Sequence, residues 1–451
     1  MRRLVVSTLA LAVLPLAACT DEPGDPATRP DASSTSETQT PSPSPSPSPS
    51  APGLPLPELT TTSAPVDVTT AARPAWTSSG IRGPKTIQVD GDLAVVATPR
   101  DQRGVDLRSG EVLWTLGDDE DLPLPGTTSA AGLVLAPSAD GPRAVSSFYA
   151  NGCAFGCPVP EQYHSEQKGI VALDATTGDV AWGRGLVGSA QADYLRPRDR
   201  DLDLVVAGVL SSPRAVVTSV GHGDIVVSGQ VDADLPVYAV ALDPVSGERL
   251  WARRGVVPEA VVADLVVVRV NDEAAPFLVG LDARTGEQRW RSPVTSPFLA
   301  LQSVSPRVIA VEAEDSDAIT LLDTRTGVPL AAQPPGVVRF CAAWVSGSLD
   351  LACEWSAPDE PSAKRLLTLD ATGSMSLSAE PLTSTPDRVV DGVVVADDVL
   401  EGPTVFLDAA GDRVGDDRPG RIESLSARYL VEGTEVRYGN ELRTITVLRR
   451  R

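Results

Sequence analysis

A ten-residue pattern that recurs along the chain constrains its fold more than any other feature of the sequence. Each copy carries Asp near its start, Gly four residues later and Trp eight residues after the Asp. The four clear copies are VDLRSGEVLW (Val105–Trp114), LDATTGDVAW (Leu173–Trp182), LDPVSGERLW (Leu242–Trp251) and LDARTGEQRW (Leu281–Trp290). A catalytic signature usually occurs once, so a repeated unit indicates an architecture of similar copies packed side by side.

Seven units are recognisable, and their spacing is that of a β-propeller. From Asp243 onward the Asp residues lie roughly 38–47 residues apart, close to the length of a four-stranded blade. The two earlier intervals are longer, and we interpret the excess as insertions near 140–168 and 185–215. The Asp and Gly of the seven turns are Asp106 and Gly110, Asp174 and Gly178, Asp243 and Gly247, Asp282 and Gly286, Asp323 and Gly327, Asp370 and Gly373, and Asp408 and Gly411.

Each part of the unit has a structural task. Short β-rich runs such as Phe277–Asp282 precede the turn, and helical periodicity is scarce. Asp can bond backbone N–H groups across the turn, and Gly can adopt the positive φ that a side chain disfavours. The fifth unit has Ala331 where Trp is expected, and the last two turns are one residue shorter. The remaining units offer Trp for packing on the next blade, at Trp114, Trp182, Trp251 and Trp290.

The two ends of the repeat region complement each other. Ala72–Gly80 resembles the end of a unit whose beginning is missing, and Arg428–Leu448 reads as a last set of strands. Joining them would complete a final blade and remove exposed sheet edges. The sequence therefore predicts an all-β fold over residues 73–451, a β-propeller of four-stranded blades closed by N- and C-terminal strands. We expect eight blades, with seven as the alternative.

The N-terminal residues indicate export and anchoring. Residues 1–18 combine Arg2 and Arg3 with an apolar stretch too short for a comfortable membrane span, as in a secretory signal. Their end, Leu16–Cys19, resembles the bacterial lipobox, which implies cleavage before Cys19 and lipidation of its thiol. Residues 19–72, centred on the Pro-Ser run Pro41–Ser50, are too poor in apolar groups to fold and predict a linker. The expected location is the extracytoplasmic face of a bacterial cell membrane.

The unit ALDxxTGxxxW resembles the repeat of PQQ-type propellers. With the lipobox and the linker, the whole is similar to β-barrel assembly scaffold lipoproteins of the BamB type, over about 75–448. The resemblance implies a propeller with either of two roles. One is a scaffold that binds an envelope protein partner, and the other is a PQQ-dependent dehydrogenase.

Four cysteines follow Cys19, an even number that predicts disulfides in an exported protein. A hairpin centred on Gly347 would place Cys341 and Cys353 opposite each other, within reach of a disulfide. Cys153 and Cys157 are expected to close a small loop by a second disulfide. The alternatives for that pair are a redox function or a metal site with His164, for which no fourth ligand is evident.

A search for catalytic chemistry finds none of the common signatures. There is no G-x-S-x-G, P-loop or H-E-x-x-H motif. The acidic runs Gly117–Asp121 and Glu312–Asp317 lack EF-hand spacing, so neither calcium nor another metal is expected. No two Cys are adjacent and C-x-x-C-H is absent, which departs from quinoprotein dehydrogenases and argues against PQQ. The formal charge of −22 argues against nucleic acid, because phosphate binding needs a positive face.

These observations favour a non-catalytic scaffold for protein or ligand binding over an enzyme. No cofactor is predicted, and the expected partners are the membrane, through the lipid anchor, and an envelope protein. The alternative is a quinoprotein-like dehydrogenase. Aromatic side chains in the first insertion are candidate partner contacts, because exposed aromatic groups on a rigid rim make good anchors; they are Phe148, Tyr149, Phe155 and Tyr163.

Overall fold

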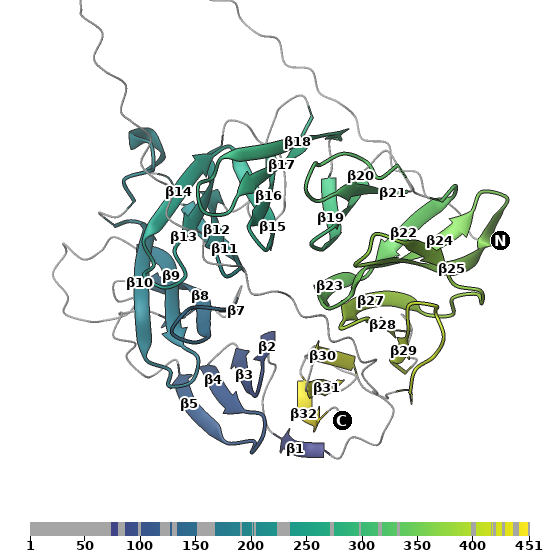
Figure 1. Ribbon diagram of the computed structural model, residues 1–451. Coiled ribbons are helices and arrows are strands. Elements are labelled where there is room, and N and C mark those ends of the chain that lie inside the picture. The colour runs from purple at the N-terminus through teal and green to yellow at the C-terminus, as the bar shows by residue number, and fades with distance from the viewer. Residues whose placement is uncertain are drawn as a thin grey trace, which may run out of the picture. The chain divides into compact units, whose positions relative to one another are not determined.

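All residues described in the computed structural model lie within Thr60–Arg451. Figure 1 shows their arrangement. The described residues are 74–79, 86–97, 101–117, 127–128, 133–150, 167–189, 192–200, 202, 204–222, 235–270, 275–296, 299–313, 318–331, 334–397, 403–415, 417, 421–425, 429–435 and 442–449. Among them, no helix has the length and apolar character needed to span a membrane.

The described strands form eight sheets, which we name A to H. Sheet A contains β1 (Pro74–Ser79), β30 (Arg421–Leu425), β31 (Tyr429–Glu435) and β32 (Leu442–Arg449). Sheet B contains β2 (Thr86–Asp90), β3 (Leu93–Ala97), β4 (Asp101–Asp106) and β5 (Val112–Gly117). Sheet C contains β6 (Thr127–Thr128), β7 (Val134–Ala136), β8 (Arg143–Ala150), β9 (Gln167–Asp174) and β10 (Val180–Val187). Sheet D contains β11 (Leu204–Ser211), β12 (Val216–His222), β13 (Val237–Leu242) and β14 (Arg249–Arg254).

The remaining sheets continue in chain order until the last two. Sheet E contains β15 (Val256–Val262), β16 (Leu265–Val270), β17 (Phe277–Asp282) and β18 (Gln288–Thr295). Sheet F contains β19 (Leu299–Val304), β20 (Val308–Ala313) and β21 (Ile319–Asp323). Sheet G contains β22 (Val337–Cys341), β24 (Leu349–Ala357), β25 (Glu360–Asp370) and β26 (Met375–Leu377). Sheet H contains β23 (Ala343–Ser346), β27 (Thr385–Val390), β28 (Val393–Asp397) and β29 (Val405–Leu407).

The chain ends share one sheet, because β1 pairs antiparallel with β32 from Pro74–Leu448 to Ser79–Thr444. All other described strand pairs are also antiparallel, except that β23 and β27 run parallel. The all-β class and the mostly four-stranded, antiparallel sheets agree with the sequence-based expectation. Each long interval between turns contains one sheet, so neither hides an extra blade among the described strands.

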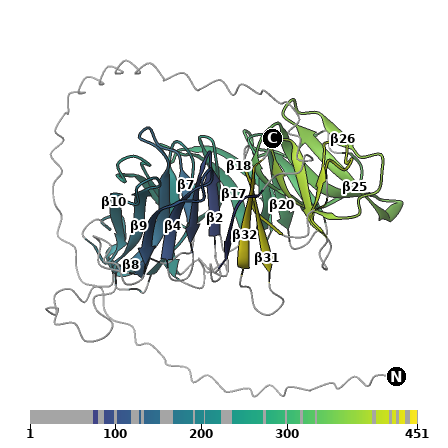
Figure 2. The same ribbon diagram turned by 90° about the horizontal axis from the view of Figure 1, so that it is seen from below.

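Sheets A to H contact one another in series. These contacts link β30 to β2, β2 to β7, β7 to β11, β11 to β15, β15 to β19, β19 to β22 and β22 to β27. Figure 2 shows the strands from the side. Apolar clusters fill the spaces between successive sheets from A to H, as between D and E and between F and G. Middle strands such as β13 are buried at every position because sheets cover both of their faces.

The two expected insertions are shorter than the sequence suggested. Residues 143–150 form β8, which pairs with β9 along its whole length, so residues 151–166 are what remain of the first insertion and lie outside the described residues. The second ends before β11 at Leu204 and contains a 3₁₀ turn at Pro197–Asp199. Its Asp199 is buried and accepts a hydrogen bond from Tyr238 Oη at 2.5 Å, which fixes this segment on sheet D. The alternation of apolar and polar residues in the sequence does not distinguish β8 and the 3₁₀ turn from the loops next to them.

Candidate functional site

The repeated turn keeps an Asp carboxylate that caps backbone N–H groups and a glycine with positive φ in both its full-length and its shortened forms. In the unit of Asp282, Oδ1 accepts hydrogen bonds from the backbone N–H groups of Arg284 at 2.9 Å and Thr285 at 2.8 Å. Gly286 N–H donates to the Asp282 carbonyl at 2.9 Å and has φ of 71°. The glycines of all seven turns have φ between 68° and 88°, a region in which a Cβ is disfavoured.

Hydroxyl groups reinforce some of these turns. Thr176 Oγ1 donates to Asp174 Oδ1 at 2.6 Å, and this bond is the main cause that lowers the pKa of Asp174 below its usual value. Thr372 Oγ1 does the same for Asp370 at 2.6 Å and lowers its pKa. Because the charged form accepts these bonds, each carboxylate stabilises the folded turn at neutral pH.

The repeated tryptophans join each sheet to the next, in what we call the tryptophan contact. The indole Nε1 donates to the backbone carbonyl of the residue that follows Asp in the next turn. The ring also lies against the glycine of that turn: a Cβ added to Gly327 would stand 2.4 Å from Trp290 Cε3. The four bonds are Trp114 to Ala175 at 2.8 Å, Trp182 to Pro244 at 3.1 Å, Trp251 to Ala283 at 2.9 Å and Trp290 to Thr324 at 2.8 Å.

A second sequence signal accompanies the tryptophan contact and was missed in the sequence. The residue two positions before Asp lies opposite the Trp on the neighbouring strand and is small in all four cases. It is Gly104, Ala172, Ala241 or Gly280. A small residue is needed there because the indole lies over it; a Cβ on Gly280 would stand 2.2 Å from Trp290 Cε2. In the units without Trp, the same position holds Leu321, Thr368 or Phe406.

Different contacts replace the tryptophan where it is lost. At the turn of Asp370, the nearest atom to a Cβ on Gly373 is Arg307 Nη1 at 3.8 Å. Arg307 comes from sheet F and forms an ion pair with Asp350 of sheet G, with Nε 3.3 Å from Oδ2. Between sheets G and H, the Thr368 hydroxyl donates to the Ala409 carbonyl at 3.0 Å, taking the place of the indole N–H.

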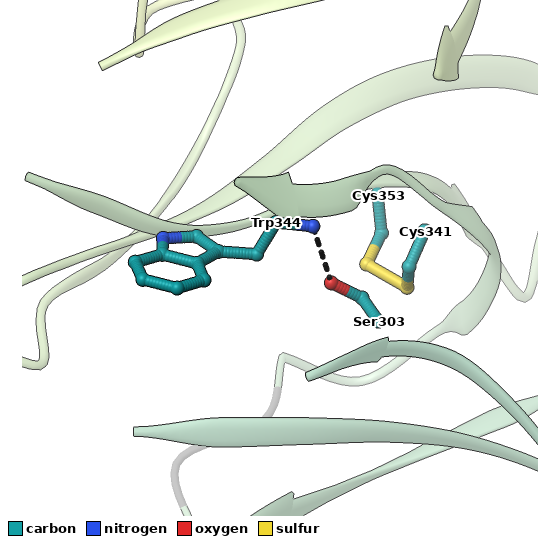
Figure 3. The surroundings of a disulfide bond; sticks show 4 residues. All are labelled: Ser303, Cys341, Trp344 and Cys353. Atoms are coloured by element: carbon teal, nitrogen blue, oxygen red, sulfur yellow. Dashed lines mark hydrogen bonds between the residues drawn. A yellow bond between two sulfur atoms is a disulfide. The ribbon is translucent and has the colours of Figure 1, made fainter. Parts of the chain in front are cut away.

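A disulfide lies in the apolar cluster between sheets F and G. It joins Cys341 and Cys353, which are also direct partners in the β22–β24 pairing, as expected from their spacing. The simple hairpin expected around Gly347 is wrong, however. After Cys341 the chain leaves sheet G, and residues Ala343–Ser346 form β23 in sheet H before returning to β24. Figure 3 shows the disulfide beside this excursion, which we call the crossing strand.

The crossing strand contacts three sheets. The backbone N–H of Trp344 donates to Ser303 Oγ of sheet F at 3.2 Å (Figure 3). Just before the strand, Ala342 N–H donates to the Ala352 carbonyl of sheet G at 2.8 Å. In sheet H the strand pairs with β27, and the Trp344 side chain packs against the clusters on both sides. The crossing strand therefore ties sheets F, G and H together where the tryptophan contact is absent.

An apolar surface accompanies the crossing strand. Phe340 is 55% exposed and has φ of 43°, and Val345 is 45% exposed. Ala343 is also exposed, two residues before Val345 on the same strand, whereas Trp344 between them is half-buried. A bulky residue rarely adopts a left-handed backbone, and such strain persists only where the surrounding structure holds it. We call Phe340, Ala343 and Val345 the Phe340 surface and treat it as the candidate binding site.

The aromatic contacts expected from the first insertion do not form a surface in the described part of the chain. Phe148 is 5% exposed and packs in the cluster between sheets B and C, so its assignment as a partner contact is wrong. It is buried because β8 is a middle strand of sheet C. Tyr149 lies on β8, but its side chain is not described. The other expected site residues lie outside the described residues: Phe155, Tyr163, Cys153, Cys157, His164 and the lipidation residue Cys19.

Comparisons with known proteins relate part of the repeat region to a family. Residues 237–377, from β13 to β26, match the family model described as outer membrane protein assembly factor BamB. No curated protein matches the chain. Among solved structures, BamB from Moraxella catarrhalis is 13% identical with a TM-score of 0.41, covering 84% of this chain and 100% of its own. Quinohemoprotein alcohol dehydrogenase from Comamonas testosteroni is 13% identical with a TM-score of 0.44, covering 84% and 76%.

A europium-containing methanol dehydrogenase is similar to a comparable degree, at 12% identity and a TM-score of 0.40 over 82% of this chain and 87% of its own. These solved structures include both an assembly factor and dehydrogenases, so they do not decide between the two roles. The family match over residues 237–377 and the repeated Asp-Gly-Trp turn show that this part of the chain is similar to PQQ-like β-propeller repeats.

Proposed function

We propose that the chain is a lipid-anchored, extracytoplasmic scaffold that binds a protein partner in the bacterial envelope through the Phe340 surface. The observation that carries the proposal is the backbone of Phe340. A left-handed conformation costs a non-glycine residue about 1–2 kcal/mol, yet here it holds an aromatic side chain out in solvent. The β22–β24 pairing holds the backbone before Phe340, and the buried disulfide at Cys341 and the crossing strand hold it after Phe340.

A rigid exposed aromatic suits a binding scaffold. Aromatic side chains supply most of the energy of many interfaces when they are held in place before binding, because less conformational entropy is then lost. Val345 and Ala343 are two further exposed apolar side chains and follow Phe340 within about five residues of the chain. Three aromatic residues of the first expected insertion remain proposed contacts with the partner at a second site: Tyr149, Phe155 and Tyr163.

The anchoring part of the proposal rests on the sequence. Cleavage of residues 1–18 would leave Cys19 as the lipidated N-terminus, and residues 19–72 would tether the repeat region to the membrane. In this arrangement residues 73–451 form the propeller. Closure of its eight sheets into a ring is supported by the pairing of the two chain ends, β1 with β32, and by the contacts that link sheets A to H in series.

The test is site-specific crosslinking in cells with Phe340→Asn. Asn tolerates the left-handed backbone, so this variant removes the aromatic ring without adding strain. We expect a discrete crosslinked envelope partner in the wild type and at least a tenfold loss of it in Phe340→Asn, with unchanged thermal stability. Val112→Asn is the matched control, because Val112 is 48% exposed on β5 of sheet B.

Equal crosslinking in Phe340→Asn and the wild type would contradict a partner at this surface. The quinoprotein-like dehydrogenase is the alternative, and it makes a separate prediction for the same purified protein. It requires calcium-dependent binding of PQQ and dye-linked oxidation of an alcohol or sugar, neither of which should depend on Phe340.

A further inference from the structure

The interface between sheets F and G contains a buried carboxylate that is incompletely paired. Asp350 lies on β24 and is 3% exposed, between Leu349 and Leu351, which belong to the apolar clusters on the two faces of sheet G. Its Oδ2 is buried and has no hydrogen-bond donor. The positive group beside it is Arg307, whose Nε lies 3.3 Å away and whose side chain is 44% exposed. A buried charge with one half-solvated partner is poorly compensated.

The surroundings favour the protonated acid. Burial is the main cause that raises the pKa of Asp350 to about 6, Arg307 opposes this rise, and the nearby Asp370 carboxylate adds to it. The other charged groups on elements packed against β24 are Arg339 on β22, Glu354 on β24 itself, Glu360, Lys364 and Arg365 on β25, Asp387 and Arg388 on β27, and Asp391 after β27. Of these, Glu354 is paired with Lys364 at 3.0 Å, and Asp387 with Arg388 at 3.1 Å.

We propose that the interface between sheets F and G is a pH-sensitive joint that tightens when Asp350 is protonated. It lies where the tryptophan contact is lost, and the ion pair with the half-exposed Arg307 compensates the buried charge of Asp350 only in part. Arg307 reaches Asp350 from the β19–β20 turn, and separation of the sheets would expose the carboxylate to water.

The direction follows from linkage. The folded state holds the Asp350 proton more tightly than the unfolded chain, whose carboxyl has a model value of 3.8. Between that value and about 6, the folded state binds the proton and the opened state does not, so stability falls as pH rises through this window. Above the window the loss is complete and constant. The joint should therefore be tighter at about pH 5 than at about pH 7.5 by roughly tenfold or more in its local opening equilibrium.

Hydrogen–deuterium exchange of the full chain at about pH 5 and about pH 7.5 tests this, after correction for intrinsic exchange rates. Peptides covering β20 and β24 should be better protected at the acidic pH, relative to peptides of β13 and β16, which serve as the internal reference. In Asp350→Asn the side chain is neutral at both pH values, so the interface should be tight and well protected from exchange at both. Arg307→Gln, at a half-exposed position, should steepen the dependence because it removes the group that opposes protonation.

Protection in β20 and β24 that increases with pH, or an unchanged pH dependence in Asp350→Asn, would overturn the proposal. If Asp350→Asn does not fold, the Arg307→Gln variant decides alone: a pH dependence no steeper than that of the wild type contradicts it.

Discussion

Sheets B to F and sheets F to H are held together in different ways. From B to F, the four tryptophans repeat one contact, in which an indole lies on the next turn and donates to its carbonyl. From F to H, an ion pair, a threonine hydroxyl and the crossing strand take its place, and a disulfide braces sheet G next to the crossing strand. The comparison teaches that the turn and the Trp are separable: the Asp-Gly turn persists in both regions, while the contact between sheets is replaceable.

The loss of Trp is accompanied by other changes. The tryptophan contact needs a small residue under the indole in its own sheet, and a glycine and a free carbonyl in the next. Sheet F has Leu321, which is fully buried, in place of the small residue, and sheet G has Thr368. A larger side chain fills the space of the ring, so the region without tryptophan keeps a packed core by a different solution.

The largest effect is expected from removing one tryptophan contact. Trp290→Ala deletes an indole that is 6% exposed and its bond to Thr324, so unfolding should lose about 3–5 kcal/mol in urea titrations. Trp290→Phe keeps much of the buried ring but loses the bond, and should cost clearly less. A cost below about 1 kcal/mol for Trp290→Ala would show that the indole is not the main tie between sheets E and F.

In the region without tryptophan contacts, the disulfide should contribute nearly as much to the free energy of unfolding. Replacing Cys341 and Cys353 together by Ser opens a loop of sequence separation 12, and we expect a loss of about 3 kcal/mol in urea titrations. The wild type under strong reductant is the matched control and should approach the variant. Equal stability of variant and oxidised wild type would contradict a structural role.

Two glycines provide a matched pair that sharpens the contrast. Gly327 and Gly373 both have positive φ, so Ala at either position adds similar backbone strain. Only at Gly327 would the new Cβ meet an indole, at 2.4 Å, whereas at Gly373 its nearest neighbour is 3.8 Å away. We expect Gly327→Ala to destabilise by about 1–3 kcal/mol more than Gly373→Ala in thermal or urea unfolding. Similar costs at both positions would mean that the ring moves aside easily.

The smallest effect concerns the hydroxyl that replaces an indole N–H. Thr368→Val removes the donor to the Ala409 carbonyl at nearly constant volume and should cost about 1 kcal/mol. Thr368→Ser keeps the hydroxyl and should recover most of that bond. Calorimetry of the two variants measures the difference, and an order with Ser less stable than Val would count against the hydrogen bond.

Local patterns made much of this fold predictable. The Asp and Gly of the seven turns depend on neighbours within a few residues, and the spacing of Cys341 and Cys353 pointed to their pairing. The small residues two positions before Asp were equally readable, because their side chains must leave room for the Trp on the adjacent strand.

Long-range placement was not predictable in the same way. In the crossing strand, Ala343 pairs with Arg388 of the neighbouring sheet. The strand is only four residues long, and its local sequence does not favour pairing with that sheet over forming a hairpin within its own sheet. Phe148 was expected at the surface because it lies within the first expected insertion, near 140–168, yet its burial depends on which sheet covers the strand. The exposure of Phe340 likewise follows from a bulge in β22, and no local sequence pattern predicts that bulge.

The most direct test of the comparison is hydrogen exchange of the folded protein with Cys341 and Cys353 replaced by Ser. We expect faster exchange in the crossing strand, in β19 and in β27, and unchanged exchange in β13 to β17, where the tryptophan contact holds the sheets. Faster exchange spread evenly over both regions, or unchanged protection of the crossing strand, would contradict two separate means of holding the sheets together.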